Sequence, residues 1–333
     1  MINGAKKAGI IGVGSAVPEK VLTNAYFEQI VDTSDEWIVT RTGIKERRIA
    51  APGEASSDYG MRAGFKALDH AGVSPEELDL IICATVTADR VLPATASIIQ
   101  DKIGAKNAAA FDLAAGCSGF VYGLAVAAGM IASGIHEKIL VIGVDLLSRI
   151  TDYQDRSTCV LFGDGAGAAV VAPAEDHGLL SFVLGSDGSG AELLKVDAGG
   201  SLMPASEETV RERRHFIQMA GQEVFKFAVK IMADASIQAL EKCGIAPEDV
   251  DLFIPHQANT RIIESAARRL GIPEEKVFVN VHKYGNTSAA SIPIAIDEAV
   301  REGRLKKGDV MVAVGFGAGL TWAASVIKWG INP

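Results

Sequence analysis

One cysteine of this chain lies where a thiol could act as a nucleophile. Cys117 stands in the run Ala-Ala-Gly-Cys-Ser-Gly, between a strand-like segment and an Ala-rich stretch that predicts a helix over residues 118–133. Unpaired amides at a helix N-terminus favour negative charge, so this position predicts a lowered thiol pKa. The flanking Gly116 and Gly119 permit a tight turn that presents the side chain, as in a nucleophile elbow.

Two further residues follow predicted strands and could assist a nucleophile. His256 comes directly after the apolar run 252–255, and Asn286 lies in the sequence Gly-Asn-Thr-Ser. An imidazole or an amide can donate a hydrogen bond to a developing oxyanion. His282 is the rival candidate, but it lies within a strand-like run rather than after one.

An internal repeat indicates how these residues meet. Residues 67–82 read ALDHAGVSPEELDLII and residues 239–254 read ALEKCGIAPEDVDLFI. Each copy predicts the end of an amphipathic helix, a glycine stop, a Pro-Glu turn and a buried strand. Strands are expected over 138–144 and 309–314, and also over 277–281 and, as a strand-turn-strand unit, over 161–171.

The repeat predicts two duplicated α/β halves, residues 1–174 and 175–333, each with a mostly parallel sheet flanked by helices. Ligands of such sheets bind at the carboxyl ends of strands. We therefore expect the loops 114–119, 256–259 and 284–288 to meet at one cleft, with Asn286 at the mirror position of Cys117.

Composition excludes several classes of function. The 333 residues carry a net charge of −9, which disfavours nucleic acid as the main partner. No run reaches the ~18 apolar residues of a membrane span, and residues 120–135 are interpreted as a buried helix. The apolar run 9–17 is too short for a signal peptide, so a cytoplasmic protein is expected.

The four cysteines lack metal-ligand spacing. Gly12-Val13-Gly14 lacks the third glycine of a dinucleotide fingerprint.

The three motifs AAGCSGF, HQANTR and YGNTSAAS, in that order, resemble the thiolase superfamily. The Cys-His-Asn combination is typical of one branch, β-ketoacyl-[acyl-carrier-protein] synthase III. The resemblance covers nearly the whole chain and includes the segments 35–48, 162–168 and 315–325. It implies a thiolase-like fold with αβαβα layers, a homodimer, no metal, and no cofactor beyond a coenzyme A thioester as substrate.

The resemblance also implies a reaction, the condensation of an acyl-CoA primer with malonyl-[acyl-carrier protein]. Cys117 would take the acyl group, and its own backbone amide and that of Ala318 would form the oxyanion hole. His256 and Asn286 would bind the malonyl thioester carbonyl and stabilise the enolate released by decarboxylation. These roles suit acyl transfer through a thiol assisted by neutral donors.

Substrate contacts follow from the same resemblance. Trp37 and Arg156 would sandwich the CoA adenine, with Arg41 near the phosphates, and Leu92 would floor the partner's acyl pocket across the dimer. Since Leu is smaller than the Phe of some relatives, we hypothesise tolerance of primers longer than acetyl. The carrier protein would contact one segment and a basic patch beside it: Gln257, Ala258, Asn259, Thr260 and Arg261, with Lys226, Arg268 and Arg269.

Three alternatives stay open at this point. A related synthase could use the same triad on a specialised or longer primer in polyketide or secondary metabolism. A Cys-His-Asn hydrolase would leave the pair Trp37 and Arg156 unexplained. A catalytically inactive homologue would not be expected to keep Cys117.

Overall fold

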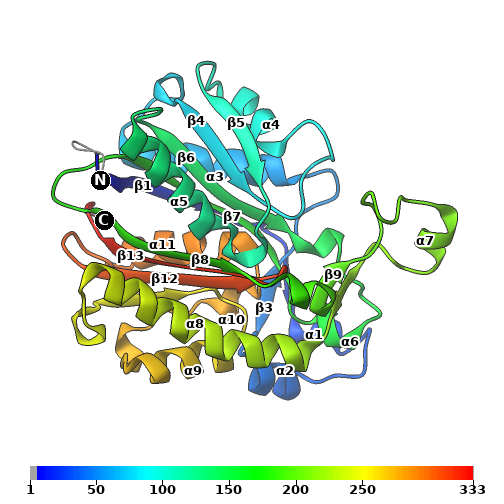
Figure 1. Cartoon of the computed structure of the whole chain (residues 1–333). Coiled ribbons are helices and arrows are strands. Elements are labelled where there is room, and N and C mark those ends of the chain that lie inside the picture. Colours follow the sequence, from blue (N-terminus) through cyan, green and yellow to red (C-terminus); the bar gives the residue numbers. More distant parts are fainter. Residues whose placement is uncertain (1–5, 333) are drawn as a thin grey trace.

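The computed structural model describes residues 6–332, in which two large β-sheets are stacked with helices between and outside them, and two small further sheets have two strands each (Figure 1). The strands are β1 (Ala8–Ala16), β2 (Val21–Thr23), β3 (Glu46–Arg48), β4 (Leu80–Ala84), β5 (Ala109–Leu113), β6 (Ile139–Leu146), β7 (Asp164–Pro173), β8 (Gly178–Ser186), β9 (Leu194–Val196), β10 (Ile217–Met219), β11 (Leu252–Pro255), β12 (Val310–Gly317) and β13 (Thr321–Lys328). The small sheets are β2-β3 and β9-β10. The helices are α1 (Asn24–Phe27), α2 (Asp35–Thr42), α3 (Ser56–Ala71), α4 (Thr95–Ile103), α5 (Gly119–Ser133), α6 (Arg156–Cys159), α7 (Glu207–Arg211), α8 (Gly221–Cys243), α9 (Thr260–Leu270), α10 (Val281–Tyr284) and α11 (Ser291–Arg301).

The first sheet has the strand order β1-β7-β6-β4-β5 and is covered on its outer face by α3 and α4. β4 runs parallel to both of its neighbours and is apolar throughout, as a strand covered on two faces must be. The glycines of the Gly12-Val13-Gly14 run serve this packing. A Cβ atom at Gly12 would lie 2.4 Å from the carbonyl oxygen of Ala67 on α3.

The second sheet has the order β11-β12-β13-β8 and is covered on its outer face by α8 and α9. It repeats four strands of the first sheet in the same relative order, with β11 parallel to β12. The chain passes from the first sheet to the second within residues 174–177, which connect β7 to β8.

The predicted αβαβα arrangement of two similar halves is confirmed, but the expectation of mostly parallel sheets is wrong. β7 pairs antiparallel with β1 and β6, and β13 pairs antiparallel with β12 and β8. A connection as short as the one from β12 to β13 can join only antiparallel neighbours.

Helices α5 and α11 form the middle layer, and the largest apolar cluster fills the space around them. Residues 116–133 are long and apolar enough to cross a membrane by length and composition alone, but half of this window is buried inside the protein. In Figure 1, α5 lies between the sheets, as the predicted buried helix.

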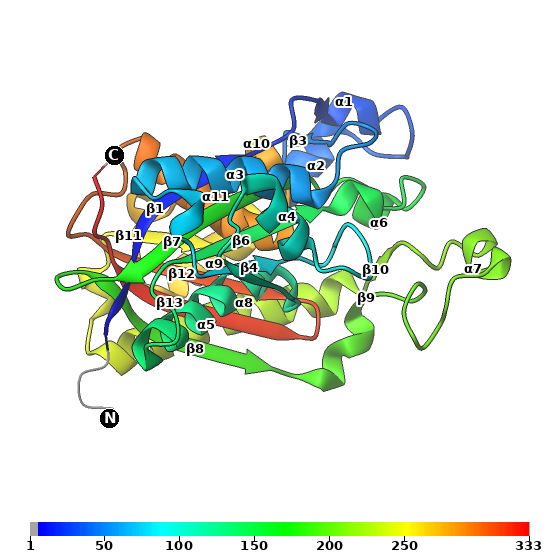
Figure 2. The same ribbon diagram turned by 90° about the horizontal axis from the view of Figure 1, so that it is seen from above.

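Two local predictions are wrong. Residues 277–281 do not form a strand, because only Val277 pairs with the sheet, through a single bridge to Phe253. His282 consequently lies in the short helix α10. The expected strand-turn-strand unit over 161–171 is instead one long strand, β7, preceded by a turn at Leu161 and the isolated bridge of Phe162 to Asn286. Seen from above, the segment that carries α7 projects away from the two sheets (Figure 2).

Candidate active site

Cys117 occupies the centre of a 3₁₀ turn, Gly116–Ser118, that leads directly into α5. Gly116 has φ +52°, a left-handed conformation that favours glycine, and a Cβ atom there would lie 2.9 Å from the amide nitrogen of Ala318. A Cβ atom on Gly317 would lie 2.4 Å from the amide nitrogen of Cys117. The end of β12 therefore passes directly against the nucleophile turn, and the structure brings the backbones of Cys117 and Ala318 together.

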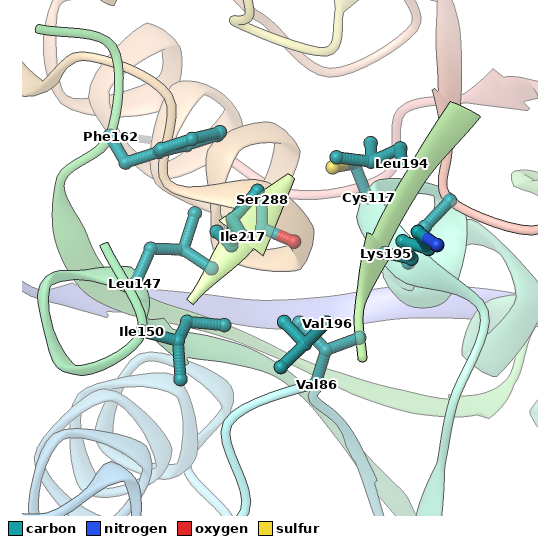
Figure 3. A pocket seen from close by; sticks show the side chains of 12 residues that line it. Val86, Cys117, Leu147, Ile150, Phe162, Leu194, Lys195, Val196, Ile217 and Ser288 are labelled. Atoms are coloured by element: carbon teal, nitrogen blue, oxygen red, sulfur yellow. The ribbon is translucent and has the colours of Figure 1, made fainter. Parts of the chain in front are cut away.

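A cavity of about 250 Å³ opens beside the Cys117 thiol. In Figure 3, mostly apolar side chains surround the sulfur atom and the hydroxyl of Ser288. Sequence reasoning did not find this cavity, because its walls come from segments far apart in the sequence. Besides Gly116, Cys117, Ser288 and Ala318, the lining residues are Val86, Leu147, Ile150, Phe162, Leu194, Lys195, Val196 and Ile217.

Burial changes the expected chemistry of the thiol. The pKa of Cys117 is raised to about 12, first because the surrounding protein desolvates the partly buried thiol; the nearby Ser288 hydroxyl offsets part of this rise, and the buried carboxylate of Asp145 adds to it by opposing a second negative charge. The predicted lowering of this pKa is wrong. Asp145 accepts hydrogen bonds from the amides of Val86 (2.8 Å) and Ala289 (3.2 Å), and so joins two loops around the cavity.

His256 follows β11 and is fully buried beside the end of β12. Its amide donates to the carbonyl oxygen of Val314 at 2.7 Å, and its ring meets Phe316 edge to face at 5.6 Å between centroids. Gly315 and Gly317 of β12 contact the backbone of Cys117. His256 and the nucleophile turn therefore pack against neighbouring residues at the end of the same strand, β12. Desolvation lowers the pKa of His256 to about 3, so the ring is neutral near pH 7.

Asn286 lies between α10 and the 3₁₀ turn Ser288–Ala290. Its backbone forms an isolated β-bridge with Phe162, in the first half of the chain. Its amide donates to Leu161 and its carbonyl oxygen accepts from Gly163, both at 2.9 Å. Its side-chain oxygen accepts the amide of Ser288 at 2.8 Å. Because the oxygen is engaged, the NH₂ group is the part of this side chain left to donate to a ligand.

Two of the three predicted loops line this cavity, 114–119 through Gly116 and Cys117 and 284–288 through Ser288. The loop 256–259 contributes no lining residue, and His256 is instead held against the end of β12. The bridge partner of Asn286, Phe162, lines the cavity together with Cys117 and Ser288. Ser288 has φ +50°, and its buried hydroxyl lacks a partner among the described residues. Sequence reasoning passed over Ser288 and Phe316 because a hydroxyl or a phenyl group in a glycine-rich motif carries no separate signal.

The structure brings the predicted adenine-binding pair together. The guanidinium carbon of Arg156, at the start of α6, lies 4.5 Å from the ring centre of Trp37 on α2. Arg41 is exposed one turn further along α2, and its carbonyl oxygen accepts a hydrogen bond from the side chain of Asn259 at 2.9 Å. That contact joins α2 to the N-terminus of α9.

The predicted carrier-protein segment divides into buried and exposed parts. Arg261 is exposed on α9, with its guanidinium 5.4 Å from the ring centre of Phe225, and Lys226 is exposed next to that ring on α8. Arg268 and Arg269 are exposed at the far end of α9, where Arg269 pairs with an aspartate of α8 at 2.9 Å. Ala258, Asn259 and Thr260 are half-buried.

Gln257 does not fit the predicted surface contact. Its side chain is 1% exposed, and its amide nitrogen donates to the carbonyl oxygens of Pro255 and Phe278. Its side-chain oxygen accepts the amide of Asn280 at 2.9 Å. The carrier-binding role of this side chain is therefore wrong, and Gln257 holds the loop after β11 in place.

Leu92 is 78% exposed in the loop between β4 and α4, next to Val91 at 93%. Within one chain these two side chains leave a large apolar surface uncovered. Leu92 does not line the cavity beside Cys117 of its own chain.

The fold and the site place this chain among the thiolase-like condensing enzymes. Residues 111–188 match the family 3-oxoacyl-[acyl-carrier-protein] synthase III, and residues 240–329 match the C-terminal part of that family. A β-ketoacyl-[acyl-carrier-protein] synthase III of Caldanaerobacter subterraneus is 60% identical over 97% of this chain and 98% of the relative. The chain belongs to the β-ketoacyl-[acyl-carrier-protein] synthase III family.

Solved structures agree with this membership. The 3-oxoacyl-[acyl-carrier-protein] synthase III of Aquifex aeolicus superimposes with a TM-score of 0.91 at 50% identity, over 97% of this chain and all of that one. The priming β-ketosynthase of the R1128 polyketide pathway has a TM-score of 0.92 at 37% identity, over 100% of this chain and 99% of that one.

Proposed function

We propose that this enzyme performs the initiating condensation of type II fatty acid synthesis. It joins an acyl-CoA primer, acetyl-CoA or a similar thioester, to malonyl-[acyl-carrier protein] and releases CO₂ and 3-oxoacyl-[acyl-carrier protein]. The observation that supports this most is a thiol at an apolar cavity, in a turn that packs against the end of β12 next to His256 and against the turn that follows Asn286. The two halves, residues 1–174 and 175–333, supply the nucleophile and the donors His256 and Asn286 respectively.

The first half-reaction is acyl transfer to Cys117. The sulfur attacks the thioester carbonyl, a new carbon–sulfur bond forms, and the bond to CoA breaks. Because the pKa of Cys117 is raised, the thiol is protonated in the free enzyme, and its proton goes in the net reaction to the departing CoA sulfur. The amides of Cys117 and Ala318 would stabilise the intermediate oxyanion.

The second half-reaction is decarboxylation followed by carbon–carbon bond formation. The side chains of His256 and Asn286 would donate to the thioester carbonyl of the malonyl group. The bond to the carboxylate breaks, CO₂ leaves, and the resulting enolate attacks the acyl carbonyl on Cys117. The Cys117 sulfur departs and takes up one proton. A neutral imidazole with a pKa of about 3 suits a donor rather than a base.

The CoA-binding role of Trp37 and Arg156 gives the first test. The guanidinium and the indole contact each other directly at 4.5 Å, so an adenine ring would have to part them before stacking on both, with each contact contributing about 1 kcal/mol. We expect Trp37→Ala and Arg156→Ala each to raise the KM for acyl-CoA about tenfold with little change in kcat.

A matched substrate provides the control. An acyl-pantetheine thioester carries the same acyl group without adenosine, so its reaction is expected to be unaffected by both substitutions. Equal losses with acyl-CoA and acyl-pantetheine would show that the pair acts on the fold of the site instead.

The carrier protein is proposed to dock on the basic patch of Lys226, Arg261, Arg268 and Arg269. These side chains lie on α8 and α9 of a protein whose net charge is −9, so they form a local exception that would attract an acidic partner. Arg41 belongs to α2 and contacts the N-terminus of α9 through its carbonyl oxygen. This place suits its proposed position near the phosphates of CoA.

We propose a homodimer in which Leu92 reaches the acyl cavity of the partner. The apolar surface of Val91 and Leu92 and the unpaired edge of β5 are features that a second copy would cover. The four cysteines are free thiols, which accords with the reducing cytoplasm as the compartment.

The cavity supports a primer longer than acetyl. In the single chain, without the partner subunit's Leu92 in its proposed place, the volume is about 250 Å³, several times that of one water-sized group, roughly 30 Å³. We expect butyryl- and hexanoyl-CoA to acylate Cys117 at rates within about tenfold of acetyl-CoA. Single-turnover rates across linear primers from acetyl to octanoyl would measure this.

The Leu92→Phe substitution provides the comparison, since a larger side chain is expected to slow the longer primers selectively. Strict preference of the unaltered enzyme for acetyl-CoA would contradict the hypothesis. A rate that rises toward the longest or branched primers would favour the alternative function, a synthase of polyketide or secondary metabolism. The similarity to the R1128 enzyme is the reason to test this alternative.

A further inference from the structure

One hydroxyl group contacts a ring nitrogen of His256. Ser291, the first residue of α11, places its Oγ atom 2.6 Å from Nδ1 of His256. Both side chains are buried, with exposed fractions of 2% and 0%. A contact this short between two desolvated groups is a hydrogen bond whose direction is set by the protons available to it.

The proton of the Ser291 hydroxyl settles that direction. The Oγ atom also accepts the amide of Gln257, at 3.4 Å, so one lone pair is occupied by a donor. Within residues 6–332, Nδ1 of His256 is the acceptor in hydrogen-bond contact with this hydroxyl. A buried hydroxyl that donated to nothing would lose about 1–3 kcal/mol. Ser291 therefore donates to Nδ1, which must be unprotonated.

The other ring nitrogen then carries the hydrogen of the neutral imidazole. In the described part of the chain, Nε2 is buried and lacks a hydrogen-bond partner. An orphaned N–H group inside a protein costs free energy and is the kind of group that a ligand satisfies. Phe316 holds the ring plane from one side, at 68° and 5.6 Å.

We propose that Ser291 is a positioning residue that fixes His256 in the Nε2–H tautomer, so that this N–H donates to the thioester carbonyl of the malonyl group. The inference rests on the proposed function and adds to it the residue that selects the donor. In the opposite tautomer, Nε2 would present a lone pair to the carbonyl oxygen and repel it. The lowered pKa of His256 keeps the ring neutral, but neutrality alone does not choose between the two nitrogens.

The direct test reads the tautomer itself. Nitrogen NMR of the enzyme labelled with ¹⁵N in histidine, with His256 assigned through the His256→Ala spectrum, distinguishes the protonated ring nitrogen from the bare one. The unaltered enzyme is expected to carry its proton on Nε2. In Ser291→Ala the donor to Nδ1 is gone, and a shift toward the Nδ1–H form is expected.

The kinetic test separates the two half-reactions. Ser291→Ala is expected to lower malonyl decarboxylation on the order of 10²-fold, the effect of losing one transition-state donor, while acylation of Cys117 changes less than about twofold. Ser291→Thr keeps the hydroxyl and is expected to restore most of the rate. Ser236→Ala serves as the matched control, because Ser236 is equally buried in a helix and donates only to the carbonyl of Met232.

Either of two results would overturn the inference: a proton on Nδ1 in the unaltered enzyme, or unchanged decarboxylation in a folded Ser291→Ala enzyme. The spectrum of the unaltered protein decides the point even if the variant does not fold. A different result would show that the proposed function itself is wrong. In that case the His256→Ala enzyme would still decarboxylate the malonyl group, whichever tautomer the spectrum shows.

Discussion

Replacing His256 or Asn286 by alanine is expected to leave acyl transfer to Cys117 nearly intact while lowering malonyl decarboxylation by about 10²–10³-fold. The reason is the division of the site. In the proposed mechanism, acylation would use the thiol and the backbone of the turn that carries it. Decarboxylation would need donors at the malonyl carbonyl, and Nε2 of His256 is a buried donor without a partner among the described residues.

The two half-reactions can be measured separately on each variant. Intact-mass spectrometry after mixing with acyl-CoA follows acylation, and CO₂ release from malonyl-[acyl-carrier protein] follows decarboxylation. Asn107→Ala and His70→Ala are suitable controls, since Asn107 is an exposed residue remote from the cavity and His70 lies on α3. Decarboxylation at the unaltered rate in both active-site variants would refute the assigned roles.

A substitution without any functional side chain is expected to have an effect of the same size. In Gly317→Ala, the new methyl group would lie 2.4 Å from the amide nitrogen of Cys117, far inside van der Waals contact. The backbone of the nucleophile turn or of β12 must shift, and the amides of Cys117 and Ala318 would lose their alignment. We expect acylation to fall on the order of 10²-fold, although every side chain of the triad is unchanged.

Gly129→Ala is the control for this experiment. Gly129 lies on α5, and a Cβ atom there would have no neighbour within 4 Å, so normal acylation is expected. Thermal unfolding of both variants would establish that the protein is folded under assay conditions. Normal acylation by a folded Gly317→Ala enzyme would show that this close approach has no part in oxyanion binding.

Much of the architecture could be predicted because duplication repeats local signals. The copies at 67–82 and 239–254 share a helix end, a glycine and a buried strand, and both become α-β units in equivalent layers. The prediction failed at 277–281, where tertiary context overrides β-propensity. There only Val277 pairs with the sheet, and the chain turns into α10 so that Asn286 can bridge to Phe162.

The candidate site could be predicted in its residues but not in its physical state. Motif spacing located Cys117, His256 and Asn286, whereas the raised pKa of Cys117 depends on burial by distant segments. The hydrogen bond between Ser291 and His256 joins the start of α11 to the loop after β11 and has no signature in either sequence. Gln257 shows the converse, because a residue within a binding motif is used entirely to hold its own loop.

The most direct measurement is intact-mass spectrometry of the enzyme mixed with a panel of acyl-CoAs, alongside Cys117→Ala. A mass increase of one acyl group per chain is expected, localised to the peptide that contains Cys117, lost on addition of malonyl-[acyl-carrier protein], and absent from the variant. Failure of every primer to acylate the unaltered enzyme, or acylation of Cys117→Ala, would contradict the assignment of this residue as the nucleophile.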